Sequence, residues 1–564
     1  MSPCPALFEL LHSCYRSFPL LPHSPLLTFS HRGQSTEMEV EREQKSLWHV
    51  GIESHDGSLE SPTERTNTAV DPGDEGEKRM RHIQEGNGLL RSLRSFETWI
   101  DRKLGVEAMG VERVPEDKRR PPQKLNMMFF WFSVLISPTL IPIGSLGPIF
   151  GLSVHTSVIL TIFAALLGTI APAFTATLSP PSGLRQVAVA RYAFGIWGAK
   201  FCGLLNIIVN GGYAVIAAVV GGQLLVAVSA DSIPLAAGIV IIVAIGFLVS
   251  FCGFTLIHHY ERYAWIVALV LICVTWGQSA RYFSPTPGLS KVSGIDYSGA
   301  CLSYFAVVFG VACSWCPIAG DYYIHYPADT SKWLVFSLTY FGQVLPTVFV
   351  GTLGNHFGGI ITSNDELSAI YNTKGTGALI LATLRPAGWA KFACTIFALT
   401  FLANVIANIY SSALCIQLWG KHFLAIPRFI WCALTSAVVL ALAWGGRNKL
   451  EAIIDNFLAI LGYWTLAFAL ILAIEHFWFR PRLGGYDLSA WQDPKRMPVG
   501  IAGTAALLIG IGFSFLGMCQ TWYVSPVAKR IGKSGGDVGD YLVFASVGIF
   551  YPVLRTLEIR LVGR

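Results

Sequence analysis

The fold of this chain is decided by the stretch VACSWCPIAGDYY, residues 311–323. It follows an apolar run that begins near Ser298 and is typical of a membrane helix. Pro317 interrupts the run, because proline lacks an N–H and its ring clashes with the preceding turn. Inside hydrocarbon, an opened backbone is stable only where it is buried in protein or lines a cavity. With Trp315 beside the break and Gly320 after it, the stretch is typical of a transporter that holds a small solute. The alternative is an ordinary kinked helix with a packing tryptophan.

The composition indicates a protein that crosses the membrane many times. The chain has 564 residues, of which 53% are hydrophobic and 13% charged, whereas a soluble domain carries about 25% charged residues. The net charge of +6 is modest and gives no indication of nucleic-acid binding. The 12 cysteines are scattered, and the C-x-x-C formed by Cys313 and Cys316 falls inside an expected membrane helix, where packing is a more ordinary role than metal or redox chemistry. We expect no cofactor and no metal site, and the missing G-x-x-x-x-G-K-[ST] motif argues against an ATP-driven pump.

The N-terminal region differs in composition from the rest. Residues 1–37 lack the basic start and the long apolar core of a secretory signal. We expect translation to begin at Met38, which would make the preceding residues an artefact of the gene model; a genuine disordered extension is the alternative. Residues 1–88 are expected to form a disordered tail. Residues 89–124 are expected to form an amphipathic, cytoplasmic segment before the membrane, which ends in a basic junction at 118–124.

Twelve apolar spans of about 20 residues, the length that a bilayer core requires, follow the tail. An even number of spans places both termini on one side, and the basic junction favours the cytoplasm. We therefore predict an all-α polytopic membrane protein with a transporter core at 125–478 and two further spans with a short C-terminus at 479–564. Gly375–Leu384 is expected to form a short outer-loop helix. The spans are expected at about 127–150, 153–177, 199–230, 233–257, 261–280, 298–319, 333–355, 389–418, 427–444, 451–478, 499–519 and 540–560.

Helix-breaking residues recur in equivalent spans. If the first ten spans form two five-helix halves, span 1 corresponds to span 6. Span 1 carries Pro138 and Pro142, and span 6 carries Pro317 and Gly320. Paired interruptions of this kind indicate an inverted-repeat transporter with its site at the breaks. The alternative is chance, since Gly and Pro are common in membrane helices.

Two aromatic and two amide residues are candidates for holding a ligand. Tyr213 follows two glycines in span 3, and together with Trp315 it could enclose a flat ring, although both could equally be packing aromatics. Asn404 and Asn408 stand four residues apart in span 8 and share one helix face. Their amides suit the polar edge of a heterocycle, and hydrogen bonding between helices is the alternative role.

Few acidic residues fall within the spans. Asp321 near the inner end of span 6 and Glu261 at the start of span 5 are candidates for proton coupling, because a buried carboxyl binds a proton more readily. Interfacial salt bridges are the alternative role. A membrane enzyme is not expected, since no catalytic cluster stands in a suitable context.

From about residue 89 to the C-terminus, a series of short segments keeps a specific order and spacing. The segments are Gly105–Glu116, Trp131–Ser133, Gly144–Leu152, Arg191–Lys200, Gly221–Gln223, Gly320–Tyr323, Tyr326–Pro327, the asparagine pair and Glu475–Phe477. Together they resemble the fungal purine–cytosine permeases of the nucleobase–cation symporter family.

This resemblance implies a LeuT-type fold of two inverted five-helix repeats plus two extra helices, in a plasma-membrane carrier that takes up cytosine and purines with protons. It implies that Trp315 stacks on the base and that Tyr213 takes the place of the span 3 aromatic, which is usually Trp. Asn404 and Asn408 match the span 8 asparagines that contact substrate, and Thr139 lies near a serine position of span 1.

The chain departs from the family pattern at two places. Ala217 stands where members carry a polar amide, and residues 404–408 read NVIAN where members tend to have Asn-Asn-x-Pro-Asn. A site that hydrogen-bonds its substrate rejects analogues without the matching groups, so the specificity is expected to differ. We expect import of a nucleobase-like heterocycle by proton symport, with the related vitamin B6 carriers and a non-transporting nutrient receptor as alternatives.

Overall fold

The computed structural model describes residues 112–119, 125–252, 254–282 and 290–564, together with isolated positions between 88 and 99, and leaves out the side chains of 251–264, 421, 451–453, 455 and 456. The described residues belong to one compact unit, Val70–Arg564. The expected tail up to residue 87 and the start at Met38 lie outside the described residues. Within the expected amphipathic segment, the described positions from 92 to 99 are helical.

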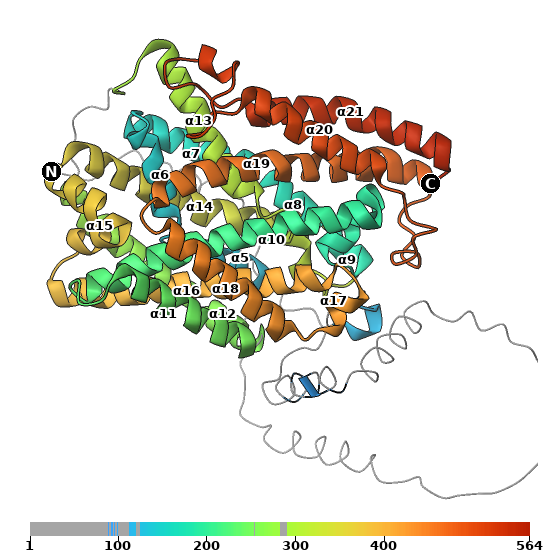
Figure 1. Ribbon diagram of the computed structural model, residues 1–564, viewed down its shortest axis with the longest axis horizontal. Helices are drawn as coiled ribbons and strands as arrows, with labels where there is room; N and C mark the ends of the chain where they lie inside the picture. The colour runs from blue at the N-terminus through green and yellow to red at the C-terminus, as the bar shows by residue number, and fades with distance from the viewer. Residues whose placement is uncertain are drawn as a thin grey trace, which may run out of the picture. The chain divides into compact units, whose positions relative to one another are not determined.

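The described chain is almost wholly helical (Figure 1). Its α-helices are α5 (Asn126–Leu135), α6 (Leu140–Ile149), α7 (Val154–Gly168), α8 (Ile170–Ala176), α9 (Ser179–Ser182), α10 (Gln186–Val228), α11 (Leu235–Cys252), α12 (Phe254–Ser279), α13 (Gly294–Cys313), α14 (Lys332–Ser363), α15 (Asp365–Thr383), α16 (Ala387–Gln417), α17 (Lys421–Ala425), α18 (Arg428–Gly446), α19 (Leu450–Ile474), α20 (Ile501–Gly517) and α21 (Gly539–Val562). The 3₁₀ turn η3 (Ala319–Tyr322) follows α13, and the π-helical turn η4 (Glu475–Phe479) and the 3₁₀ turn η5 (Arg480–Leu483) follow α19.

The helices confirm an all-α membrane protein. Within the described residues, nine helices are long and apolar enough to cross a membrane, and the bent pair α5–α6 would make a tenth. The shorter apolar helices at Leu235–Ser250 and Ile501–Gly517 coincide with the spans expected at 233–257 and 499–519. The count of twelve spans stays a prediction. The expected outer-loop helix forms the second half of α15, beyond a kink at Gly375.

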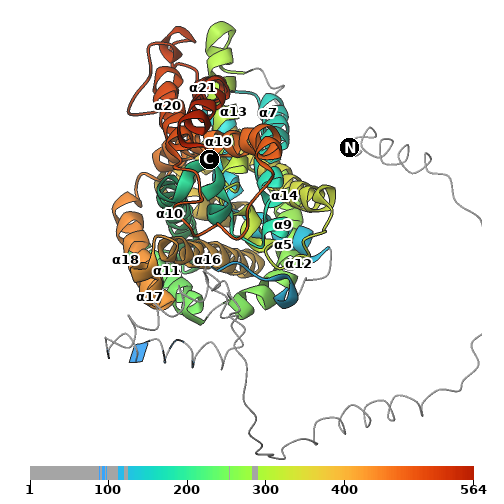
Figure 2. The same cartoon turned by 90° about the vertical axis from the view of Figure 1, so that its right-hand side faces the viewer.

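The long helices lie side by side and pack through small residues. α10 packs along α16, while α20 and α21 form a pair beside α19 at one edge of the bundle (Figures 1 and 2). α13 and α19 cross closely: a Cβ at Gly310 would stand 2.4 Å from the Leu458 carbonyl oxygen, and one at Gly462 would stand 3.2 Å from the Gly310 Cα. Glycine at such crossings allows backbones in a bilayer to approach closely.

Both expected helix breaks are present in the structure. α5 and α6 meet at an angle of 55°, and Pro138 lies in the gap between them. α13 ends at Cys313, and the chain runs in turns through Pro317 before η3. Pro142, which we expected to help interrupt span 1, lies in the first turn of α6 instead. A helix can hold proline there, because the first backbone N–H groups have no partner within the helix.

Candidate functional site

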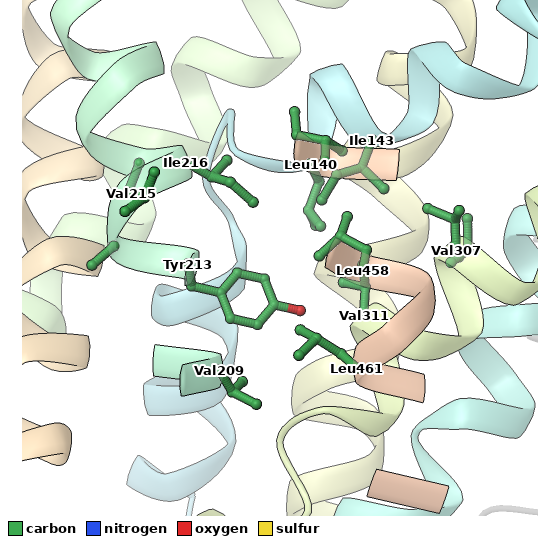
Figure 3. Packing of buried hydrophobic residues seen from close by; sticks show 14 of the residues in the cluster. Leu140, Ile143, Val209, Tyr213, Val215, Ile216, Val307, Val311, Leu458 and Leu461 are labelled. Atoms are coloured by element: carbon green, nitrogen blue, oxygen red, sulfur yellow. The ribbon is translucent and has the colours of Figure 1, made fainter. Parts of the chain in front are cut away.

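The two candidate stacking residues lie together at the break that follows α13. The rings of Tyr213 and Trp315 are nearly parallel, at an interplanar angle of 19° with centroids 6.2 Å apart. The Tyr213 hydroxyl hydrogen-bonds the Ser314 hydroxyl at 2.9 Å. Figure 3 shows Tyr213 pointing from α10 toward Val311 of α13 and Leu461 of α19. The turn that follows the end of α13 therefore places Trp315 beside Tyr213, the aromatic residue of span 3.

Further aromatic rings support Trp315 from the other broken span. Trp131 of α5 meets Trp315 edge-on at a centroid distance of 5.7 Å, and it contacts Tyr322 of η3 in the same way at 5.2 Å. Trp131 is fully buried, and Trp315 is 8% exposed. Edge-to-face contacts of this kind fix ring orientation as well as adding stability. The first half of span 1 therefore holds the Trp315 ring in place.

The asparagine pair lies on α16, which runs antiparallel to α10. The contacts of Asn210 with Ser411 and of Asn206 with Cys415 set the register of the two helices. This register places Asn408 level with Tyr213. The Asn408 amide donates to the Asn404 backbone oxygen at 2.8 Å and to the Asn404 side-chain oxygen at 2.9 Å. The groups of the pair that remain for a ligand are therefore the Asn408 carbonyl and the Asn404 NH₂.

The same register places Ala217 level with Asn404. Ala217 is fully buried, and its methyl group takes the place of the longer amide that the family pattern has at this position. The side of the site next to Asn404 is therefore less polar than that pattern suggests.

Thr139 and Asp321, two other expected site residues, bond groups outside the aromatic pair. Thr139, in the break of span 1, bonds the Ser137 hydroxyl at 2.9 Å. Asp321, in η3, accepts a hydrogen bond from the Gln186 backbone at 2.6 Å and lies 3.8 Å from the Arg185 guanidinium. Burial raises the pKa of Asp321, and Arg185 opposes that rise. The Glu261 side chain lies outside the described residues. The backbone of Gly320 touches Ser179, since a Cβ there would stand 2.1 Å from the Ser179 hydroxyl oxygen.

A cavity of about 510 Å³ opens at the end of the bundle that carries α15. Pro142 of α6, Gln223 of α10 and Ile454 of α19 are among its lining residues, and Lys374 of α15 pairs with Asp231 beside it. Its volume is typical of small-molecule sites. The cavity is therefore lined in part by α10, the helix that also carries Tyr213.

Phe457 connects the lining of this cavity with Tyr213. It stands one turn along α19 from Ile454, and it meets Tyr213 edge-on at a centroid distance of 6.1 Å. A Cβ at Gly212 would stand only 1.9 Å from the ring of Phe457. Because residue 212 is a glycine, the ring of Phe457 can pack directly against the chain beside Tyr213.

The opposite end of the bundle is covered by the segment at 112–119. The buried Arg119 side chain donates to the backbone oxygens of Val114, Pro180 and Tyr326, at 3.1, 2.7 and 3.1 Å. Charge-assisted hydrogen bonds are about twice as strong as neutral ones. One guanidinium therefore ties the segment before the membrane to α9 and to the loop after η3.

Sequence reasoning did not find Phe457 or this role of Arg119. Phe457 is one apolar residue in an apolar span, and only its packing on Gly212 distinguishes it. Arg119 was read as part of a basic junction that orients the chain. Its side chain is held by carbonyl groups of α9 and of the loop after η3, which sequence spacing does not indicate.

Comparison with known proteins places the chain in a family. The family model described as permease for cytosine/purines, uracil, thiamine and allantoin matches residues 113–539. The purine-cytosine permease FCY2 of Saccharomyces cerevisiae is 33% identical over 82% of this chain and 88% of its own length. The purine-cytosine permease fcyB of Emericella nidulans is 33% identical over 82% and 91%. The vitamin B6 transporter TPN1 of Saccharomyces cerevisiae is 31% identical over 84% and 92%. These relatives are permeases and transporters rather than enzymes.

Solved structures show the same fold. Mhp1, a nucleobase-cation-symport-1 family transporter, matches in a closed conformation with bromovinylhydantoin bound, with a TM-score of 0.58 at 16% identity over 80% of this chain and 96% of Mhp1. Its inward-facing conformation gives a TM-score of 0.59 over 80% and 95%. This likeness confirms the expected LeuT-type fold. The chain therefore belongs to the family of permeases for cytosine/purines, uracil, thiamine and allantoin, and it is a multi-pass membrane transporter.

Proposed function

We propose that this protein imports a small planar nitrogen heterocycle, most simply a purine or cytosine, across the plasma membrane together with protons. The observation that carries the proposal is the nearly parallel pair of Tyr213 and Trp315 at the break of α13. A flat ring between two aromatic faces needs a spacing of about 7 Å, since carbon atoms in contact lie about 3.5 Å apart. The ring centroids are 6.2 Å apart, so the two faces are closer than this spacing and the rings would have to separate to admit a base.

The amides supply the polar edge of the proposed site. The Asn408 carbonyl and the Asn404 NH₂ offer one acceptor and one donor, which matches the alternating edge of a nucleobase. The alanine at position 217 removes one amide that the family pattern supplies, and this favours a second candidate substrate, vitamin B6. The chain is 31% identical in sequence to the vitamin B6 transporter TPN1 and 33% identical to FCY2. These similar values support both candidate substrates.

Alternating access explains why the aromatic pair is covered on both sides. With both termini in the cytoplasm, as proposed, the cavity beside α15 opens to the outside and Phe457 connects its lining with the site. The contacts of Arg119 then close the cytoplasmic side. Import would require the contact of Phe457 with Gly212 to open first and the contacts of Arg119 to open later.

Uptake in a yeast strain without its own carriers tests the proposed function. Radiolabelled cytosine, adenine, hypoxanthine, uracil and pyridoxine are supplied with and without a protonophore. We expect saturable uptake of a purine or cytosine that collapses with the protonophore. Uptake of pyridoxine alone would keep the mechanism and change the substrate. Binding without accumulation, by protein confirmed at the surface, would contradict the transporter proposal and support a receptor.

Replacing Phe457 by alanine should weaken substrate retention and leave transport intact. Loss of one aromatic contact over the site costs about 0.5–1.5 kcal/mol, which corresponds to a roughly two- to tenfold rise in KM. The maximal rate should change little, because the ring covers the site without forming it. The matched control is Phe544→Ala, whose ring is 58% exposed on α21. A loss of maximal rate with an unchanged KM would contradict the covering role of Phe457.

A further inference from the structure

Asp540, in the first turn of α21, is a buried acid without a compensating group. Asp540 is only 6% exposed. Among the described residues, neither of its carboxylate oxygens has a hydrogen-bond partner. A buried ionised carboxylate without donors is costly, whereas the protonated form removes most of that cost. Buried polar groups without partners are uncommon in native proteins and call for an explanation.

The neighbouring acid Asp537 is different. It lies just before α21 and accepts hydrogen bonds from the backbone of Cys519 at 3.0 Å and of Gly539 at 2.9 Å, and from the side chains of Tyr463 and Gln520. Burial raises the pKa of Asp537, and these donors oppose the rise. Asp537 therefore has a structural role in closing the loop before α21.

Asp540 lies where α19 and α13 cross. Its Oδ1 would stand 3.0 Å from a Cβ at Gly462 of α19, and Gly462 packs directly on Gly310 of α13. Cys313, one turn further along α13, is near enough to act on Asp540 electrostatically. Ser314, the next residue, holds the Tyr213 hydroxyl. Asp540 therefore lies beside the crossing of α13 and α19, one turn before the end of α13 that precedes Trp315.

The titratable groups around Asp540 are acidic or neutral. They are Asp537 in the preceding loop, Cys313 on α13, Tyr463 on α19 and Tyr541 on α21 itself. α20, which also packs against α21, has no titratable side chain in its sequence. Within the described part of the chain, the groups that act on Asp540 therefore supply no positive charge, and only the helix N-terminus favours its ionised form.

We propose that the Asp540 carboxyl is the site that binds the coupling proton. This inference rests on the proposed proton symport. A proton from the outer side adds to an Asp540 carboxylate oxygen and gives a neutral carboxyl. The neutral form allows the close packing of α13 on α19 at Gly462, and release of the proton inside restores the charge. Of the acids that the sequence pointed to, Asp321 is the weaker candidate, because it already faces Arg185.

The test is Asp540→Asn in the full-length chain, with radiolabelled cytosine, or pyridoxine if the wild type takes that up instead. Asparagine resembles the protonated carboxyl, so the variant should fold. We expect it to exchange labelled for unlabelled substrate across the membrane at a rate near that of the wild type. Concentrative uptake should be lost, so that inside and outside concentrations become equal, and substrate should no longer draw protons from an unbuffered medium. Wild-type uptake should rise as the outside pH falls, and uptake by the variant should not respond.

Two further variants separate a coupling role from a structural one. Asp537→Asn should lower the amount of protein at the surface, while the molecules that arrive keep their pH response. Asp540→Glu should restore accumulation in part with a shifted pH profile. Accumulation by Asp540→Asn that still collapses with a protonophore would overturn the proposal. If that variant fails to reach the surface, an unchanged pH profile in Asp540→Glu would overturn it instead. A wild type that accumulates substrate without any protonophore effect would refute the proton coupling itself, which is a separate result.

Discussion

Trp315→Ala is expected to abolish measurable uptake while the protein still reaches the plasma membrane. In the proposed site, the Trp315 ring covers one face of the substrate, with Tyr213 on the other. Loss of that face removes both the burial of the ring and its stacking contact, together about 2–3 kcal/mol of binding free energy. This corresponds to a roughly thirty- to hundredfold loss of affinity. Initial uptake rates over a range of substrate concentrations, normalised to surface protein, measure the effect.

The control for this variant has to separate binding from folding. Trp315 also packs against Trp131, and deleting a core tryptophan side chain costs about 3–5 kcal/mol of stability. Trp315→Phe keeps an aromatic face and should retain part of the uptake. Trp333→Ala removes a tryptophan that is 80% exposed and should behave like the wild type. Uptake kinetics in Trp315→Ala equal to those of Trp333→Ala would exclude Trp315 from the site.

Local chemistry made the helix breaks predictable. Proline removes a hydrogen bond wherever it stands in a helix interior, so Pro138 and Pro317 indicated the interruptions of spans 1 and 6 from sequence alone. Pro142 did not, because its effect depends on where the new helix begins, and α6 begins two residues earlier. The aromatic pair was foreseen in the same way: Trp315 stands at a break, and Tyr213 follows two glycines.

Properties that depend on distant packing were not predictable. Asn404 and Asn408 were expected to share a helix face, but their register against Tyr213 depends on how α16 packs on α10. Asp540 read only as the first residue of a span. Whether an acid at the start of a helix finds hydrogen-bond donors depends on how the loop before the helix folds. Here the backbone N–H groups of Cys519 and Gly539 donate to Asp537.

Glu475→Ala is expected to be strongly destabilising at the end of α19. Glu475 lies in the π-helical turn η4 with its side chain 1% exposed, and it pairs with two arginines. Arg480 lies 2.6 Å from its Oε1, and Arg555, fully buried on α21, lies 3.1 Å from its Oε2. The Tyr551 hydroxyl donates to the same carboxylate at 2.7 Å. Spacing could not reveal this cluster, because Arg555 is 80 residues away in the chain.

Removal of this one carboxylate takes the ion-pair partner from the buried Arg480 guanidinium and leaves Arg555 with Glu558, which lies 3.7 Å away. Breaking a buried ion pair from one side costs about 3–5 kcal/mol, a large part of a typical folding free energy of about 5–15 kcal/mol. We expect a lower yield, retention inside the cell and a clearly lower unfolding temperature of the purified protein. Asp487→Ala is the matched control, because its pair with Arg496 is about half exposed on both sides and exposed pairs contribute little. If the two variants unfold at the same temperature, the buried cluster does not hold α21 to the end of α19, and the attachment of the last two helices must depend on their apolar contacts alone.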